Sequence, residues 1–273
     1  MSFSSGITVP GTAGGNIVVS TGAGDYLKLA TQMATLLNGI QGSTLTVATV
    51  TAGSAAPTPP ITTNTTELGV TGAGGVSTSP QSGWNFVVNV TSSPDTIVSS
   101  NNQVLSGDQG ATIIESGTNT VAATGGNNFV NDIGNYLIST STGNDTIFAL
   151  GSGTVAAGAG ANFVSVNGGN NYVISAGTGD TIRHGGGLAS VLAVGTGATI
   201  SGSSSATDTL AVSLGGSGNV VYAGQTQASV TISGFSAPSQ AGGGATSGTG
   251  NAVIGGSSAA GNLNVFVPVA LLR

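Results

Sequence analysis

The stretch that decides the fold runs from Ser141 to Gly187 and reads STGNDTIFALGSGTVAAGAGANFVSVNGGNNYVISAGTGDTIRHGGG. Single aliphatic or aromatic residues alternate in it with small polar ones, and glycines interrupt the pattern at short intervals. Pieces of three or four residues between glycines are typical of short β-strands and argue against helix. The stretch therefore predicts many short strands that are joined by sharp turns.

The pattern recurs about every 18 residues through the middle of the chain, with two strand-like pieces in each repeat. The first pieces align on Ile97, Ile113, Phe129, Ile147, Phe163, Ile182 and Ile200. The second pieces align on Val104, Val121, Leu137, Val155, Val173, Val191 and Leu210. Because stacked repeats place each strand beside its equivalent, the aligned side chains should form the interior. We predict an all-β fold, a parallel β-solenoid of the β-roll kind with about 18 residues per coil.

Two polar columns accompany the first strand of each repeat. The residues directly before the aligned positions are Thr96, Thr112, Asn128, Thr146, Asn162, Thr181 and Thr199. One position earlier stand Asp95, Ala111, Asn127, Asp145, Ala161, Asp180 and Ala198. We interpret both columns as hydrogen-bonding ladders between coils. An ice-binding surface would need two regular threonine columns side by side, and the mixed second column argues against it.

At STGNDTIFALG the sequence resembles the RTX (repeats-in-toxin) family, whose motif Gly-Gly-x-Gly-x-Asp-x-U-x winds a calcium-filled parallel β-roll. Its third glycine falls on Gly143, its aspartate on Asp145 and its apolar residue on Ile147, while Thr140 and Ser141 replace the first two glycines. The resemblance covers about residues 95–235, and it implies Asp145 and Asp180 as calcium ligands. Since Asp145 would have Asn127 and Ala161 as neighbours in that alignment, we expect no required cofactor and little dependence on calcium.

The ends of the chain differ from the repeats. Residues 1–55 form a predicted head, in which Leu29, Met33, Leu36, Leu37 and Ile40 give residues 25–40 the pattern of an amphipathic helix. We expect this helix to cover an end or a flank of the solenoid. A Pro/Thr/Gly-rich connection follows at 56–83, the solenoid at 84–235, and a Gly/Ser-rich tail with terminal strands, suited to a secretion signal, at 236–273.

Composition excludes several classes of partner. The chain has 273 residues, 48 of them glycine, with 9 acidic and 3 basic residues and a formal net charge of −6. Its cations are Lys28, Arg183 and Arg273, too few for a nucleic-acid surface or for attachment to anionic lipid. Absence of cysteine rules out disulfides and thiolate metal sites. No apolar run is long enough for membrane insertion.

The sequence contains few residues of the kinds that catalyse reactions. His184 is the one histidine, beside Arg183 and near Asp180, and a lone histidine at a glycine turn is typical of a solvated surface residue. Trp84, in the alternating run GWNFVVNVT, is either a core or end-cap residue or a platform for stacking a sugar. We predict that the protein is not an enzyme.

A structural protein that assembles outside the cell is the function that we favour from the sequence. A regular solenoid with almost no lysine to protect its strand edges suits head-to-tail stacking into filaments or a surface or biofilm matrix layer. Val230 and Val265 are the predicted assembly residues in the terminal ladder. The alternative is an RTX-like cell-surface adhesin or carbohydrate-binding protein, with extracellular polysaccharide as its partner. The resemblance also implies secretion by a type I channel without an N-terminal signal peptide.

Overall fold

The computed structural model describes residues 6–12, 15–20, 25–40, 45–51, 54–60, 62, 64–72, 77–78, 83–91, 94–107, 110–232, 239–241, 245–248, 250–255 and 263–266. Two compact units divide the chain, Met1–Thr146 and Ile147–Arg273. Each unit is a parallel β-solenoid with coils of about 18 residues, which confirms the predicted fold class.

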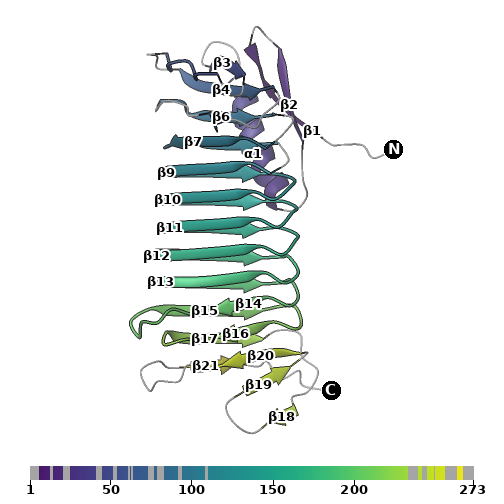
Figure 1. Cartoon of the computed structure of the whole chain (residues 1–273), viewed down its shortest axis with the longest axis vertical. Coiled ribbons are helices and arrows are strands. Elements are labelled where there is room, and N and C mark those ends of the chain that lie inside the picture. The colour runs from purple at the N-terminus through teal and green to yellow at the C-terminus, as the bar shows by residue number, and fades with distance from the viewer. Residues whose placement is uncertain are drawn as a thin grey trace, which may run out of the picture. The chain divides into compact units, whose positions relative to one another are not determined.

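In the first unit, two series of parallel strands, called ladders A and B, form the solenoid (Figure 1). Ladder A contains β5 (Ser77–Thr78), β7 (Thr96–Ser100) and the first halves of β9 (Thr112–Ala123) and β10 (Phe129–Thr140). Ladder B contains β3 (Leu45–Thr51), β4 (Thr65–Thr71), β6 (Phe86–Asn89), β8 (Gln103–Ser106) and the second halves of β9 and β10. The parallel ladder thus begins at β3, before residue 84, the start predicted from the sequence.

The second unit opens with β11 (Thr146–Ala157) and has the same two ladders. Its ladder A contains the first halves of β12 (Phe163–Ser175) and β13 (Thr181–Ala193), then β14 (Thr199–Ser201), β16 (Val220–Tyr222) and β20 (Asn251–Ile254). Its ladder B contains their second halves, then β15 (Thr209–Leu214), β17 (Gln227–Ile232) and β21 (Leu263–Phe266). Two short strands, β18 (Ser239–Ala241) and β19 (Ala245–Gly248), continue antiparallel from β20 and cover its edge.

Glycine bends explain why the sequence suggested two short strands per repeat where the structure has one long strand. In β9 and β10, Gly117 and Gly134 lie opposite each other with φ of 99° and 136°, values that L side chains rarely adopt. The chain turns from ladder A to ladder B at these glycines without interrupting its hydrogen bonds to the next coil. From β9 to β13 the two predicted pieces are therefore the two halves of one strand, whereas in the coils before and after them the pieces are separate strands, such as β7 and β8 or β14 and β15.

The interior columns correct four of the predicted alignments. Ile113 pairs with Val130 and not with Phe129, and Ile182 pairs with Val164 and not with Phe163. In ladder B, Ile138 takes the interior position predicted for Leu137, whereas Leu210 is also buried but pairs with Ala189, so that Val212 is the partner of Val191. The paired interior side chains Ile113, Val130, Val164, Ile182 and Ile138 are all 0% exposed. The space between the ladders suits aliphatic side chains, whereas the larger phenylalanine rings lie on the outer surface, in register with Thr112 and Thr181.

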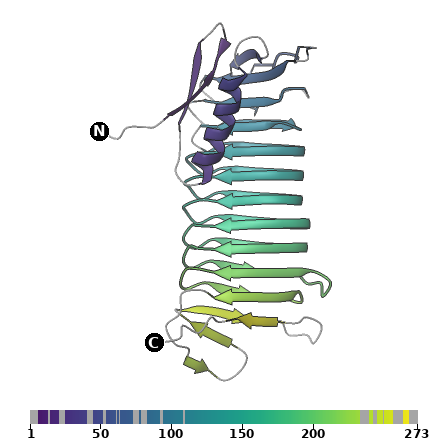
Figure 2. The same ribbon diagram turned by 180° about the vertical axis from the view of Figure 1, so that it is seen from behind.

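Helix α1 (Asp25–Gly39) covers a flank of the first unit and not one of its ends (Figure 2). Together with the antiparallel hairpin of β1 (Gly6–Pro10) and β2 (Asn16–Ser20), it packs on the outer face of ladder B. Met33 and Leu37 are buried against Phe86, Leu105 and other apolar residues of that face, while Leu36, a predicted contact, is 49% exposed. Asn38 Nδ2 donates to Thr8 O at 2.8 Å and ties the helix end to the hairpin.

Candidate functional site

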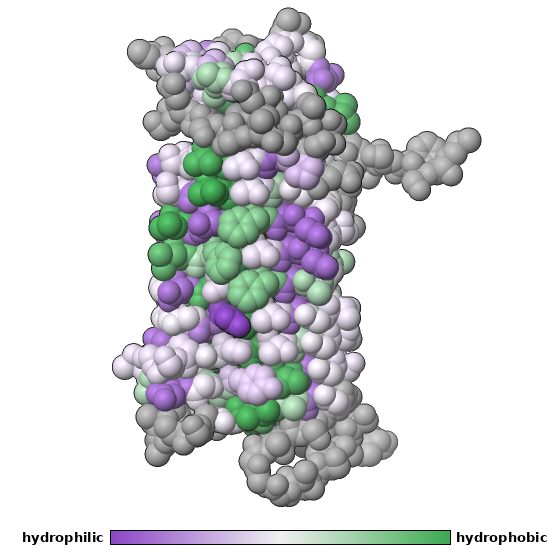
Figure 3. Space-filling view, in the orientation of Figure 1, coloured by the Kyte–Doolittle hydropathy of each residue, from purple (hydrophilic) through white to green (hydrophobic). Residues whose placement is uncertain are grey.

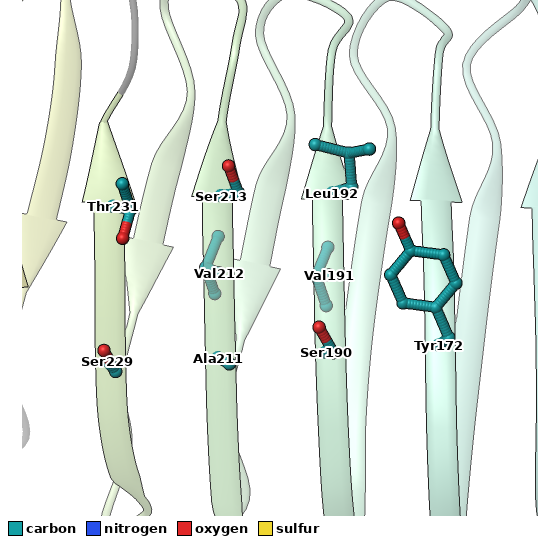
Figure 4. Close-up of a pocket in the computed structure, with 9 residues that line it drawn as sticks. All are labelled: Tyr172, Ser190, Val191, Leu192, Ala211, Val212, Ser213, Ser229 and Thr231. Atoms are coloured by element: carbon teal, nitrogen blue, oxygen red, sulfur yellow. The ribbon is translucent and has the colours of Figure 1, made fainter.

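A shallow groove of about 220 Å³ lies on the outer face of ladder B in the second unit (Figure 4). Tyr172 of β12 and Leu192 of β13 rise at one side of it, and β15 and β17 contribute only small outward side chains. Val191 and Val212 point to the opposite side of the sheet, into the core. The groove therefore exists because two neighbouring coils have small residues where the preceding coils have large ones.

The register arranges the lining of the groove in two rows. Tyr172, Ser190, Ala211 and Ser229 are paired in one row, and Ile174, Leu192, Ser213 and Thr231 in the other. Beyond them on β21, Asn264 and Phe266 continue the rows, and Phe266 is 59% exposed. Since neighbouring strands are about 4.8 Å apart, Tyr172 and Phe266 mark a path of roughly 19 Å across β12, β13, β15, β17 and β21.

The chemistry of this lining is neutral and rich in hydroxyl groups. Serine and threonine hydroxyls both donate and accept hydrogen bonds, which matches the hydroxyls of a sugar. An exposed tyrosine ring offers an apolar face with a polar end, and Tyr172 is 39% exposed. No charged residue lines the groove. An uncharged ligand with many hydroxyl groups fits this surface best.

The sequence did not reveal the groove because its residues come from four separate repeats. Tyr172 was visible only as a residue next to the interior position Val173. The outward placement follows from the alternation of side chains along a strand, but the depression depends on which small residues become neighbours. That information lies in the register, which the sequence alignment had misplaced at Leu210.

The polar column that precedes ladder A differs from the predicted one at two positions, where Asn128 replaces Asn127 and Asn162 replaces Ala161. In the first unit it consists of Asp95, Ala111, Asn128 and Asp145, with Asn128 in the place expected for Asn127. The Oδ1 atom of Asn128 accepts from Ala111 N at 3.0 Å. Asp145, only 1% exposed, accepts at Oδ1 from Asn128 N at 2.8 Å and from Asn128 Nδ2 at 2.9 Å. Each side chain thus binds the backbone of the preceding coil.

In the second unit, Asn162, Asp180, Ala198, Asn219 and Asn251 form the corresponding column. Asp180 is 0% exposed and accepts at Oδ1 from Asn162 N at 2.8 Å and from Asn162 Nδ2 at 3.0 Å. Its Oδ2 accepts from Gly177 N at 3.1 Å and from the Ser175 hydroxyl. Both of its oxygens are therefore occupied by hydrogen-bond donors.

These contacts suit a hydrogen-bonded ladder better than a calcium site. Calcium takes 6–8 oxygen ligands, whereas Asp145 and Asp180 face amide N–H groups of an asparagine. Within the described residues, no group of three or more His, Cys, Asp or Glu side chains could hold a metal ion.

We expect excess chelator to leave the unfolding temperature unchanged, because removing calcium lowers stability only if the folded state binds calcium. Circular dichroism during heating, with chelator and with added calcium chloride, is the measurement. A lower unfolding temperature in chelator would show that the folded protein binds a divalent cation, and the same experiment on Asp145→Asn and Asp180→Asn would show whether either residue holds it.

Val230 and Val265, the predicted assembly residues, lie opposite each other in ladder B of the second unit. Val230 is 0% exposed and pairs with Val212 on one side and Val265 on the other. It is an interior residue and not a terminal one, so a lysine there would disturb the core. Val265 lies on β21, the strand that follows β17 in this ladder, and is half-buried.

Trp84 and His184 are both buried. Trp84 is 1% exposed and donates from Nε1 to Pro57 O at 3.3 Å, so the sugar-platform interpretation is wrong and the core interpretation is confirmed. His184 is 2% exposed, in contrast to the solvated residue that we predicted. Burial lowers its pKa below the ordinary value, against the opposing effect of Asp208.

Within the described part of the chain, no helix combines the length and apolar character needed to cross a bilayer. Comparison with known proteins gives no match to a family model, to a curated protein or to a solved structure.

Proposed function

We propose that the chain is an extracellular glycan-binding protein of the adhesin or matrix type, and that a neutral polysaccharide lies in the groove beside Tyr172. The observation that carries the proposal is the pair of outward rows on ladder B, with hydroxyl groups between Tyr172 and Phe266. A sugar unit in an extended glycan advances the chain by a length similar to the strand spacing. Successive sugars can therefore meet successive coils.

Several other features support this function. The groove is open and its residues are fixed by ladder hydrogen bonds, so an extended polymer can enter without rearranging the protein. The described residues that line the groove include no carboxylate, histidine or lysine, which suits binding better than catalysis. Export through an RTX-like type I route, and a location at the cell surface or in the extracellular matrix, belong to the same proposal.

Replacing Tyr172 with alanine should weaken binding to a soluble neutral glucan about five- to tenfold, because the stacking face for a sugar ring is lost. Affinity electrophoresis or calorimetry with the purified protein measures the change. Tyr222→Ala is the matched control, since Tyr222 is another exposed tyrosine of the second unit, on ladder A and outside the groove. Equal losses in both variants, or no binding of neutral glycans by the unmodified protein, would contradict the proposal.

Self-association into a matrix layer is the second candidate function, and exposed apolar side chains favour it. Ile114 and Ile133 of the first unit and Phe148, Leu150 and Leu188 of the second are each at least 36% exposed. Figure 3 shows apolar side chains, in green, on the visible face. Contact between such faces is lateral, whereas the β18–β19 hairpin obstructs end-to-end pairing at β20. Sedimentation velocity separates the candidates, because only self-association depends on protein concentration.

A further inference from the structure

Glu67 of β4 is buried in the first unit, and no cation among the described residues contributes to its pKa. Its side chain is 0% exposed and lies in register with Val47 of β3 and Phe86 of β6. Among the described residues, neither carboxyl oxygen has a hydrogen-bond partner. Burial alone raises the pKa of Glu67 to about 8. The group is therefore uncharged at neutral pH and charged only in alkaline surroundings.

A pair of buried acidic residues, Glu115 and Asp132, occupies the interior of the same unit. Glu115 of β9 is 2% exposed and lies between Ser99 of β7 and Asp132 of β10, which is 0% exposed. The Ser99 hydroxyl donates to Glu115 Oε1, and Asn119 Nδ2 donates to Asp132 Oδ1 at 2.8 Å. The remaining oxygens, Glu115 Oε2 and Asp132 Oδ2, are buried and have no partner among the described residues.

Burial raises the pKa of both carboxyl groups of this pair above the ordinary values. Burial, together with the nearby charge of Asp132, raises the pKa of Glu115 to about 8, although the Ser99 hydrogen bond opposes the change. Burial likewise raises the pKa of Asp132 to about 6. Tyr136 of β10 is the other titratable group beside Asp132, and its pKa is raised too. Among the described residues, no cation contributes to the pKa of Glu115 or of Asp132.

We propose that the first unit is an acid-dependent fold, whose coils stay closed while Glu67, Glu115 and Asp132 are uncharged and loosen as the surrounding pH rises from acidic to mildly alkaline. A carboxyl group whose pKa is higher in the folded state than in the unfolded state stabilises the fold fully at low pH. That stabilisation is lost as the pH rises through the folded-state value, near 6 for Asp132 and near 8 for the two glutamates.

The second unit provides an internal contrast with the opposite sign. His184 is buried, and its pKa is lowered by burial, with Asp208 and the backbone of Gly186 and Gly187 as the opposing groups. Neutral His184 contributes to the stability of the second unit at neutral pH. This contribution is lost as the pH falls below the ordinary histidine pKa of about 6.5. With no cysteine and one histidine in the chain, few other groups titrate between pH 5 and pH 9.

Thermal unfolding of the full chain at pH 5, 6, 7, 8 and 9, followed by calorimetry, tests the proposal. Unfolding of the first unit should occur about 10 °C lower at pH 9 than at pH 5. In the variant with Glu67→Gln, Glu115→Gln and Asp132→Asn this dependence should disappear, because the amides carry no titrating proton. Asp208→Asn is the control for net charge, since it removes one acidic charge from the second unit and should leave the dependence in place.

Hydrogen exchange of the unmodified protein tests the same proposal without any substitution. After correction for intrinsic rates, peptides that contain residues 64–72 and 110–140 should exchange faster at pH 8.5 than at pH 5.5, while peptides from 161–232 should not. Equal protection at both pH values, or a first unit that becomes more stable in alkali, would overturn the proposal. A test with calcium chloride at pH 9 gives a further outcome that would overturn the proposal. If calcium restored the unfolding temperature of the unmodified protein but not that of Asp132→Asn, the acidic pair would be a cation site.

Discussion

Asp180→Ala should lower the free energy of unfolding of the second unit by about 3–5 kcal/mol, because it removes a buried acceptor and leaves several donors without partners. Asp180 accepts from Asn162 N, Asn162 Nδ2, Gly177 N and the Ser175 hydroxyl. Two of these donors belong to the preceding coil, so the loss weakens the contact between coils. Urea unfolding followed by circular dichroism measures the effect.

Asp180→Asn is the matched variant and should cost only about 1–2 kcal/mol. Its amide oxygen can still accept from both groups of Asn162, its NH2 group can donate to the Ser175 hydroxyl, and the hydrogen bond from Gly177 N is lost. If the asparagine variant were as unstable as the alanine variant, the charge of Asp180 would matter more than its acceptors. That result would favour a bound cation over the hydrogen-bonded ladder.

Gly143→Ala should destabilise the first unit by about 3 kcal/mol or more, for two reasons that act together. Gly143 has φ of 122°, a conformation that alanine rarely adopts. A Cβ atom there would lie 1.6 Å from Gly126 O, a backbone atom of the preceding coil, so the two coils would have to separate. Urea unfolding of the purified variant measures this loss.

Gly39→Ala provides the control for a change of the same size. Gly39 is the last residue of α1, has no atom within 4 Å of the added Cβ and does not have positive φ. We expect this variant to be neutral or slightly stabilised, because alanine favours helix over glycine. A similar loss in both variants would mean that the close approach of the coils at Gly143 is not the cause.

The repeat length and the interior pattern were predictable because each coil of a solenoid repeats the same pattern of apolar residues and glycines in the sequence. Val104 and Val121, or Val173 and Val191, are spaced by one coil and do pair in the structure. The register was harder, because a turn that is one residue longer moves every following side chain to the other face. For this reason the sequence pattern predicts Phe129 and Phe163 as interior residues, although their neighbours Val130 and Val164 fill the core.

The burial of Glu115 and Asp132 could have been predicted from their positions in the strands. Side chains alternate along a strand, so Glu115, two residues after the interior Ile113, falls on the same face. Asp132 has the same relation to Val130. Glu67 had no such signal, because β4 lay within the segment predicted as a connection. The helix pattern at 25–40 was clear, but which flank it covers depends on the hairpin of β1 and β2.

The polar column also limits how a chain of this kind can lengthen during evolution. Inserting a second copy of the coil that carries Asp145 directly after the first would set two carboxylates beside each other in a buried column, where neither can donate to the other. Copying the coil of Asn128 along with it would keep an amide donor before each carboxylate, and the amide oxygen would accept from the backbone as it does from Ala111. Gene duplication should therefore preserve this fold more readily when it adds coils in pairs.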